Sequence, residues 1–386
     1  MNASNEKTIE GAAVAERDDR WRADSFVIAL ILAMKFLVLL FGGIAYTIFQ
    51  NKPLVGFYGW LSIWNQWDAS HYLDIARNGY VTEGDQRNWI VFFPLFPWVV
   101  RLFALALRDY LLSAFAVSAL ASVAAGLLLR RLAEFDVDRA TGRTAIWFMF
   151  IFPTSYFFHI GYTESLFLAL ALGSFLAARR RKWWLAGAAG ALASLTRLNG
   201  LLLFPALACE AFLQYRAARQ RRLRAEWLWI ALVGVGFLLY LLINRHVHGS
   251  PFAFLTFQRE RFFKTPAWPW IGIIKVWTWE WGDARRGLMN GPVEFFFIFF
   301  SLACTVWCWK TLRSSYAVWM ALNWLLFTST SMVNSVPRYT LILFPIYILL
   351  ARATVARPVW SRVITAWSLT FMALFISLFV QGAWAY

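Results

Sequence analysis

A short polar segment in the first third of the chain has the residue types of a general-base site. Asp68, His71 and Tyr72 are separated by spacings of three and four, so a helix that begins near Asp68 places them on one face. A carboxylate there could accept a proton from a hydroxyl group, with His71 as its partner or as a second catalytic contact. The alternative is structural: Asp68 caps the helix and His71 is a polar residue at an interface.

Two isolated arginines are candidates for binding a phosphate group. Arg197 stands in a Thr-Arg-Leu-Asn-Gly stretch and Arg338 in a Val-Pro-Arg-Tyr stretch, each flanked by apolar sequence. A guanidinium can hold a phosphate in two-point geometry. A single arginine at the end of an apolar helix more often reaches toward the membrane interface. Because both are expected at the same membrane face, we interpret them as candidate phosphate ligands.

Other polar residues near these segments are candidate substrate contacts. Glu164 lies at the start of a predicted helix, where it suits the positive end of the helix dipole. A sharper alternative is that it orients an acceptor hydroxyl or pairs with Arg197. Gln258 belongs to a long loop that would carry polar residues in any case. The candidate substrate-binding residues are Tyr72, Glu164, Asn199, Gln258 and Tyr339.

Familiar signatures of soluble enzymes are missing from the sequence. There is no Gly-rich phosphate loop, no HExxH metal motif and no GxSxG nucleophile motif. The 4 histidines are scattered, and the 3 cysteines lie inside apolar segments. Asp68 and Asp74 are six residues apart and so fall on different faces of a regular helix. We therefore predict no cofactor and no metal site built from these residues. Whether the activity requires a divalent metal stays open.

The composition is that of a membrane protein. Of 386 residues, 60% are hydrophobic and 15% are charged, and the mean hydropathy is +0.54. Several apolar stretches are long enough, or nearly so, to cross a hydrocarbon core of roughly 30 Å, among them 26–49, 111–129, 295–309 and 363–380. The net charge of +16 comes mostly from short basic clusters between apolar segments. These clusters indicate topology and contact with membrane lipids rather than a nucleic-acid partner.

The basic clusters predict which loops face the cytoplasm. The positive-inside rule places there the loops 130–143, 179–182, 216–224, 310–313 and 352–362. The apolar segment 92–107 contains an arginine and two prolines, so we interpret it as re-entrant or interfacial rather than as a crossing. The result is an all-α polytopic transmembrane bundle with roughly eleven spans, its N-terminus inside and its C-terminus outside.

This topology divides the chain into two parts. Residues 1–24 form a cytoplasmic N-terminal tail, and residues 25–386 form a single transmembrane domain. Within the domain, residues 50–110 are the first outer loop with its interfacial segment, and residues 244–291 are a long outer loop. The unusual polar residues then collect at the outer face, although nothing in the topology argument required this. Ionisable groups gathered at one membrane face predict a functional site.

The order of motifs along the chain resembles a known family. The matching segments are Trp67-Asp68, His71-Tyr72, Ile75-Ala76, Gly79-Tyr80, Phe92-Phe93-Pro94-Leu95-Phe96-Pro97, Tyr162-Thr163-Glu164-Ser165-Leu166-Phe167, Thr196-Arg197 with Asn199-Gly200, and Arg338-Tyr339 with Phe344-Pro345. In this order they resemble the PIG-V family, which comprises GPI-type mannosyltransferases and their prokaryotic relatives. That family lies within the GT-C superfamily of polytopic glycosyltransferases.

The resemblance implies a reaction and a set of roles. It implies transfer of a sugar, typically mannose, from a polyprenyl-phosphate donor to a lipid-linked or other glycan acceptor, with inversion at the anomeric carbon and without a nucleotide sugar. By the same resemblance Asp68 is the general base in the first outer loop, and Arg197 and Arg338 are candidates for the donor phosphate. The active site then faces away from the cytoplasm.

Some features depart from the eukaryotic members. The chain is shorter and its Arg- and Ala-rich cytoplasmic loops look bacterial, which predicts a bacterial cytoplasmic membrane, or the ER membrane if the source is eukaryotic. In a bacterium a GPI acceptor is excluded, and the transferred sugar need not be mannose. The loop 244–291 matches least and is expected to shape the choice of acceptor. The competing hypothesis is a transporter or flippase of a lipid-linked or anionic substrate, which would place charges near mid-membrane and often shows two matching halves.

Overall fold

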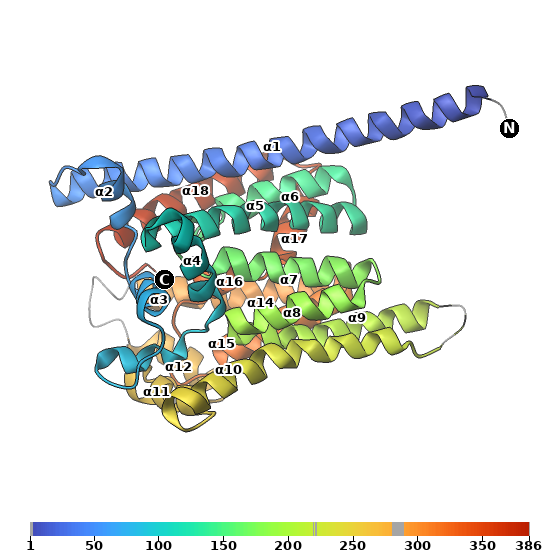
Figure 1. The fold of residues 1–386 in the computed structure, drawn as a ribbon. Coiled ribbons are helices and arrows are strands. Elements are labelled where there is room, and N and C mark those ends of the chain that lie inside the picture. The colour runs from blue at the N-terminus through green and yellow to red at the C-terminus, as the bar shows by residue number, and fades with distance from the viewer. Residues whose placement is uncertain (1–2, 219, 221, 280–288, 386) are drawn as a thin grey trace.

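The chain folds into a bundle of helices whose axes run side by side (Figure 1). The computed structural model describes residues 3–218, 220, 222–279 and 289–385. Among those residues the only β-pairing is an isolated bridge between Pro266 and Thr330. The predicted all-α fold is therefore confirmed.

The helices fall into two groups by position. Those that run along the bundle are α1 (Ala3–Gln50), α5 (Tyr110–Asp136), α6 (Arg139–Ile151), α7 (Glu164–Arg179), α8 (Trp183–Thr196), α9 (Leu203–Ala217), α10 (Leu232–His248), α14 (Glu294–Thr311), α15 (Ser314–Thr328), α17 (Pro345–Thr354) and α18 (Pro358–Val380). Shorter helices gather at one end, here named the short-helix end: α2 (Gly56–Ser62), α3 (Asp68–Asn78), α4 (Leu95–Leu107), α11 (Ala253–Phe262), α12 (Pro269–Trp279) and α16 (Val336–Thr340). The basic turns after α5, α7 and α9 lie at the opposite end, named the basic end.

Several helices are long and apolar enough to cross a bilayer by length and composition. The described residues contain 6 such helices, or up to 7 if one bent pair counts as a span: Trp21–Gln50, Tyr110–Asp136, Leu198–Ala217, Ala225–His248, Gly291–Thr311 and Pro358–Val380. Helices satisfy their own backbone hydrogen bonds, which lipid cannot do. The chain is thus a multi-pass membrane protein. The count of roughly eleven spans stays a prediction, because α6, α7, α8, α15 and α17 are shorter.

The segment expected to be re-entrant contains a sharp bend. The 3₁₀-helix η1 (Asp85–Val91) and helix α4 meet at 111°, the geometry of a broken span or a re-entrant loop. Helix α4 has 13 residues, too few to cross a core of roughly 30 Å on its own. From α4, Arg101 donates to the carbonyls of Ala76 (2.6 Å) and Arg77 (2.7 Å) near the end of α3. Helix α4 therefore braces α3.

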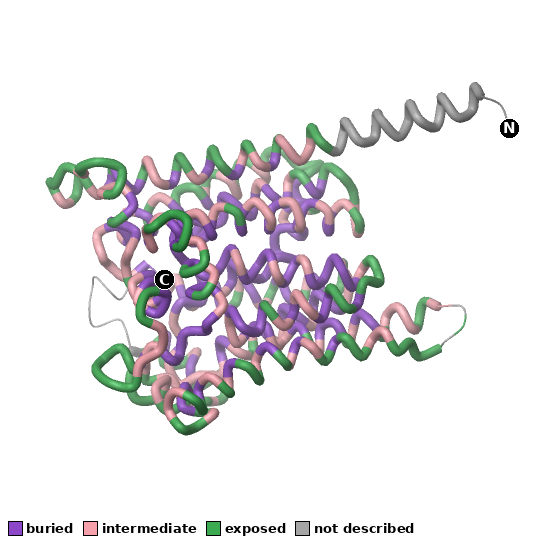
Figure 2. Tube along the Cα trace, in the orientation of Figure 1, coloured by how far each residue is buried: buried purple, intermediate pink, exposed green. Residues whose placement is uncertain are grey.

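The most buried part of the molecule lies along the middle of the bundle, where α7 packs against α5 and α8 (Figure 2). Aromatic rings fill much of it, among them Phe175 and Phe344, whose ring centroids are 5.2 Å apart. Apolar side chains such as Phe36 on α1 and Leu238 on α10 are instead exposed. In a membrane protein these outward rows face lipid.

Buried carboxylates tie the helices together at the basic end. Glu210 on α9 is fully buried and accepts two hydrogen bonds from Arg313, at 2.8 and 2.9 Å, and one from Arg179 at 3.2 Å. Asp136 on α5 accepts from Arg179 and from Tyr316. Charged pairs with this many hydrogen bonds hold α5, α7, α9 and α15 in a fixed arrangement, although pairs of this kind add little net stability.

Candidate active site

Asp68 is the first residue of α3, as the sequence predicted. The N-cap is Trp67, whose φ of 53° turns the chain sharply into the helix. Tyr72 and Ile75 are buried against the bundle, which leaves Asp68 and His71 only partly buried. The Asp68 side chain is 29% exposed, and its Oδ2 atom accepts from Arg338 at 2.6 Å. The carboxylate thus faces another part of the chain instead of capping its own helix.

A network of alternating charges extends inward from Asp68. Arg338 Nε also donates to Glu164 Oε1 at 2.5 Å. The same Oε1 atom accepts from Arg197, which in turn donates to the hydroxyl of Thr163 at 3.0 Å. Glu164 is fully buried at the start of α7, and Arg338 is 7% exposed. Two cations therefore share one buried carboxylate.

Local structure fixes both arginines in place. Arg338 belongs to α16. The backbone N–H groups of its N-cap, Ser335, and of its first residue, Val336, donate to the buried carboxylate of Glu294 at 2.5 and 2.7 Å. Arg197 follows α8 in extended conformation, and the chain then folds back at Gly200. A Cβ atom on Gly200 would lie 2.3 Å from the backbone nitrogen of Ser194, so the turn requires glycine.

The Arg338 guanidinium also lies against two aromatic rings. It is 4.9 Å from the ring centroid of Phe157 and 4.6 Å from that of Tyr162. The Tyr162 hydroxyl is anchored by donation to the carbonyl of Gln66 at 2.8 Å. Cation–π contacts in a desolvated setting are stabilising. Rings and carboxylates together leave this guanidinium little freedom.

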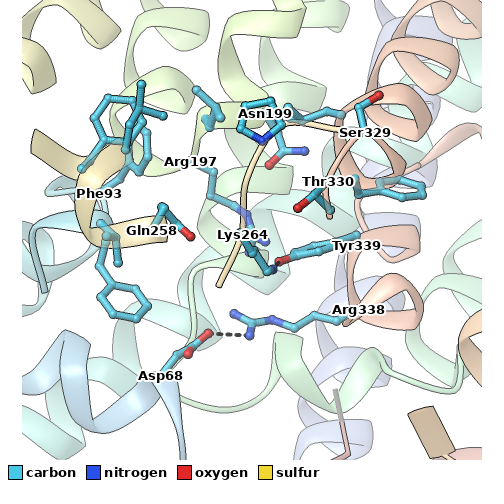
Figure 3. Close-up of a pocket in the computed structure, with 18 of the residues that line it drawn as sticks. Asp68, Phe93, Arg197, Asn199, Gln258, Lys264, Ser329, Thr330, Arg338 and Tyr339 are labelled. Carbon is cyan, nitrogen blue, oxygen red and sulfur yellow. Dashed lines mark hydrogen bonds and ion pairs between the residues drawn. The ribbon is translucent and has the colours of Figure 1, made fainter. Parts of the chain in front are cut away.

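A cavity of about 320 Å³ opens beside this network and is largely walled by apolar side chains (Figure 3). We name it the apolar-walled cavity. Its apolar wall contains Phe93, Leu198, Phe254, Leu255, Leu326 and Phe327. Its polar lining includes Asp68, Arg197, Lys264 and Arg338, so three cations and one carboxylate lie beside the apolar wall, together with uncharged polar residues such as Gln258. That combination suits a ligand with an anionic group and an apolar chain.

A second cavity, of about 410 Å³, lies next to the first. We name it the aromatic-walled cavity, because Trp67, Trp89, Phe262, Phe263 and Trp384 line it together with polar residues. Its polar lining includes His71, Arg261 and Asn334. Flat aromatic faces beside amide and charged groups suit a polyhydroxylated ligand with apolar ring faces.

The two cavities share one set of residues. Both are lined by Val91, Phe92, Asp68, Gln258, Lys264, Arg338 and Tyr339. The Asp68–Arg338 ion pair therefore lies where they adjoin. A carboxylate in this place can contact a ligand in either cavity and could accept a proton from a hydroxyl group bound there.

The remaining predicted residues take distinct positions. His71 lines the aromatic-walled cavity, and its ring stacks on Trp89 with centroids 3.7 Å apart. Tyr72 and Asn199 line the apolar-walled cavity, and Asn199 donates to Asn323 at 2.7 Å. Glu164 lines neither cavity: it lies behind the two arginines, in the arrangement that pairs it with Arg197.

Lys264 and Trp384 are among the lining residues that were not singled out from the sequence. Lys264 belongs to the long loop 244–291, where a basic residue is unremarkable by itself. Trp384 lies three residues from the start of the C-terminal turn at Gln381, and its ring meets that of Trp67 edge-on with centroids 5.2 Å apart. Neither position follows a periodic pattern, so no local signal could have assigned them to the site.

No group of three or more His, Cys, Asp or Glu side chains that could hold a metal ion is found in the described part of the chain. Asp74, six residues after Asp68, is engaged elsewhere: it accepts from Asn78 at 2.7 Å and from Trp89 at 3.0 Å. The chemistry visible in the protein itself is thus that of a carboxylate beside a cluster of cations.

Comparison with known proteins places this geometry in context. Residues 55–279 match the family described as "Mannosyltransferase (PIG-V)". GPI mannosyltransferase 2 of Schizosaccharomyces pombe is 32% identical over 145 residues, which are 36% of this chain and 30% of that protein. GPI alpha-1,6-mannosyltransferase 2 of Mus musculus is 32% identical over 164 residues, 39% of this chain and 32% of that protein. The chain spans about a third of the length of these relatives.

Two solved structures are also similar. ArnT from Cupriavidus metallidurans, bound to undecaprenyl phosphate, gives a TM-score of 0.49 at 16% identity and covers 84% of this chain and 59% of that one. The oligosaccharyltransferase of Archaeoglobus fulgidus gives a TM-score of 0.49 at 14% identity and covers 91% of this chain and 53% of that one.

The family match extends over more than half of the chain and includes Asp68, Glu164, Arg197 and Lys264. It therefore contains three of the four charged residues that form the network between α3, α7, α8 and α16. The resemblance inferred from the motifs is confirmed, and the chain belongs to the PIG-V mannosyltransferase family.

Proposed function

We propose that this protein transfers a sugar, mannose in the first instance, from a polyprenyl-phosphate donor to a hydroxyl group of a lipid-linked or other glycan acceptor. The observation that carries the proposal is the Asp68–Arg338 pair, which lines two adjoining cavities of different character. Family membership and the names of the GPI mannosyltransferase relatives support mannose as the sugar.

In this proposal the donor binds in the apolar-walled cavity. An isoprenoid chain is apolar and its phosphate is anionic, which matches a wall of Phe and Leu side chains next to Arg197, Lys264 and Arg338. The acceptor binds in the aromatic-walled cavity, where Trp67, Trp89 and other rings suit the apolar faces of sugars. Its hydroxyl group can then donate its proton to Asp68, which lines both cavities.

The chemical step follows from that arrangement. The acceptor oxygen attacks the anomeric carbon and forms the new C–O bond while the bond from that carbon to the phosphate oxygen breaks. The hydroxyl proton passes to Asp68, and the bonding electron pair leaves with the phosphate, so the configuration inverts. Cations preorganised around the departing phosphate stabilise the charge that develops there. This sequence of events assigns no step to a cofactor.

The location of the site supports an active centre on the non-cytoplasmic side. The basic turns, such as residues 179–182, lie at the opposite end of the bundle from α3 and α16. The positive-inside rule assigns that basic end to the cytoplasm. We therefore propose that the short-helix end faces outward, in a bacterial cytoplasmic membrane, or into the ER lumen if the protein is eukaryotic.

The direct test supplies reconstituted full-length protein with radiolabelled polyprenyl-phosphate mannose and a membrane-lipid extract as acceptor. We expect label to appear in a new glycolipid, and we expect no transfer when GDP-mannose is the only donor. Labelled donor that crosses the bilayer with its sugar still attached, and no transfer, would favour a transporter instead. Transfer from GDP-mannose alone would contradict the proposed donor.

A second prediction concerns pH. Burial raises the pKa of the Asp68 carboxyl, but the charge and hydrogen bond of Arg338, together with the charges of His71 and Arg197, outweigh it and hold the pKa below its usual value. Burial lowers the pKa of His71, and the charges of Asp68 and Asp74 offset only part of this effect. At neutral pH the base is therefore charged and the imidazole is neutral.

Because the base must be deprotonated and its pKa is depressed, activity should persist as the pH falls through the ordinary carboxyl range. We expect kcat/KM to be flat from about pH 5 to 8 and to decline only below pH ~4. The measurement is a pH–rate profile of the wild type and of His71→Gln. An acidic limb that lies below the ordinary imidazole pKa of about 6.5 but above the carboxyl range, and that disappears in His71→Gln, would instead identify His71 as the titrating group.

A further inference from the structure

The cations that line the apolar-walled cavity, Arg197, Lys264 and Arg338, outnumber the carboxylates paired with them. Arg338 is paired with Asp68 and Glu164, and Arg197 is paired with Glu164. The third cation is Lys264, whose ammonium group makes a weak hydrogen bond of 3.4 Å to the hydroxyl of Tyr339. Among the described residues it forms no ion pair with a carboxylate. Three positive charges thus face two negative ones, and the unmatched charge is on Lys264.

Lys264 is placed to meet a ligand in either cavity, because it lines both. Its ammonium nitrogen lies 5.6 Å from the ring centroid of Tyr339, and the Arg197 guanidinium lies 5.7 Å from the same centroid. In Figure 3 the lysine side chain lies beside the Tyr339 ring, within the lining of the apolar-walled cavity. Two cations therefore contact one ring at the edge of the donor space.

The backbone on either side of Lys264 is held firmly. We name residues 263–267 the strap. They are hydrogen-bonded to residues 329–331, which follow α15. Ser331 N donates to the carbonyl of Thr265 at 2.8 Å, and Ala267 N donates to the carbonyl of Ser329 at 3.2 Å. The hydroxyls of Thr265 and Ser331 are 2.8 Å apart. A cation on a segment fixed in this way is preorganised for an anion.

We propose that Lys264 binds the phosphate of the lipid-linked sugar, because it is the one cation lining the apolar-walled cavity that forms no ion pair with a carboxylate of the described residues. The assignment rests on the proposed function and adds a residue to it. Arg197 and Arg338 must share their charge with Glu164 and Asp68, whereas Lys264 can give its full charge to the ligand.

The attraction between Lys264 and the phosphate increases as the reaction proceeds. The donor phosphate is a diester with a charge of about −1, and the departing lipid phosphate is a monoester with a charge of about −1.5 to −2. A fixed cation therefore interacts more strongly with the transition state than with the bound donor. Removing it should lower kcat as well as donor affinity.

The experiment uses full-length protein and compares Lys264→Met with Lys264→Arg, and with Lys275→Met as a matched control. Lys275 is an exposed lysine on α12 and lines neither cavity. Binding of farnesyl phosphate, farnesol and inorganic phosphate is measured by calorimetry, and kcat and KM for the polyprenyl-phosphate donor are measured in the transfer assay.

We expect Lys264→Met to weaken farnesyl phosphate binding by about ten- to a hundred-fold and to leave farnesol binding unchanged. Lys264→Arg should retain most of the affinity, and Lys275→Met all of it. In the transfer assay kcat should fall in Lys264→Met only. Folded Lys264→Met protein that binds farnesyl phosphate as the wild type does would overturn the proposal, even if it binds inorganic phosphate more weakly.

The binding measurements and the transfer assay test the Lys264 assignment and the transferase function separately. If no sugar is transferred by any variant while farnesyl phosphate binding still depends on Lys264, the transferase proposal fails and the lipid-phosphate site stands. If the wild type transfers mannose and Lys264→Met matches it in both binding and turnover, the transferase stands and the Lys264 assignment fails.

Discussion

Replacing Asp68 with Asn is expected to lower kcat for sugar transfer by roughly a hundred- to ten-thousand-fold, the contribution typical of a positioned general base. The amide keeps the shape of the side chain and can still accept from Arg338, but it cannot take up the acceptor proton. Helix α3 should stay in place, since Tyr72, Ile75 and Ala76 bury its inner face.

Donor binding distinguishes loss of the base from damage to the site. In Asp68→Asn the Arg338 guanidinium keeps Glu164 as a partner and loses one of its two carboxylates. The site then carries one more net positive charge, so an anionic donor should bind as well as before or more tightly. The expected pattern is a large fall in kcat with no rise in the Kd of farnesyl phosphate.

Asp74→Asn is the matched control for this substitution. Asp74 lies on the same helix, accepts from Asn78 and Trp89, and lines neither cavity. Its variant should keep most of the transfer rate. Near-normal turnover of purified Asp68→Asn, measured beside Asp74→Asn, would remove Asp68 as the base.

Charge patterning allowed the sequence to predict which residues meet. The basic clusters indicate the cytoplasmic turns, and an even number of crossings between neighbouring clusters sends the intervening turns to the other face. That argument brought Asp68, Glu164, Arg197 and Arg338 to one end of the bundle. The structure joins all four through hydrogen bonds.

Of the pairs among these residues, the sequence suggested only that of Glu164 with Arg197. Asp68 and Arg338 are 270 positions apart, and they meet where the backbone N–H groups of Ser335 and Val336, at the start of α16, donate to the buried carboxylate of Glu294. A phosphate that binds Arg338 must therefore compete with two protein carboxylates. Sequence reasoning raised the pairing of Glu164 with Arg197 as an alternative but gave Arg338 no carboxylate partner, and the structure pairs both arginines.

The cavities themselves also lay beyond the sequence. The apolar-walled cavity depends on the strap, residues 263–267, which is fixed by hydrogen bonds to residues 329–331 across more than sixty positions of sequence. Such contacts between irregular segments leave no periodic signal. From the sequence Lys264 is an ordinary loop residue, whereas in the structure it is the cation of the apolar-walled cavity that forms no ion pair with a described carboxylate.

Replacing Glu164 with Ala is expected to destabilise the protein by roughly 3–5 kcal/mol, the cost of leaving a buried ion without its partner. The carboxylate is fully buried, and one of its oxygens accepts from both Arg338 and Arg197. Without it, two desolvated guanidiniums remain close together with only the partly exposed Asp68 nearby. The measurement is the free energy of unfolding of purified protein in detergent, from a denaturant titration.

The control is Glu226→Ala, which removes an exposed carboxylate that pairs with Arg224 at 3.0 Å. Pairs of this kind contribute about 1 kcal/mol or less, so this variant should unfold nearly as the wild type does. The double variant Glu164→Gln with Arg197→Gln should recover part of the loss, because it removes a buried cation together with its partner. If Glu164→Ala proves as stable as Glu226→Ala, Glu164 does not hold the arginines in place, and their positions must depend on the aromatic rings and on α16 instead.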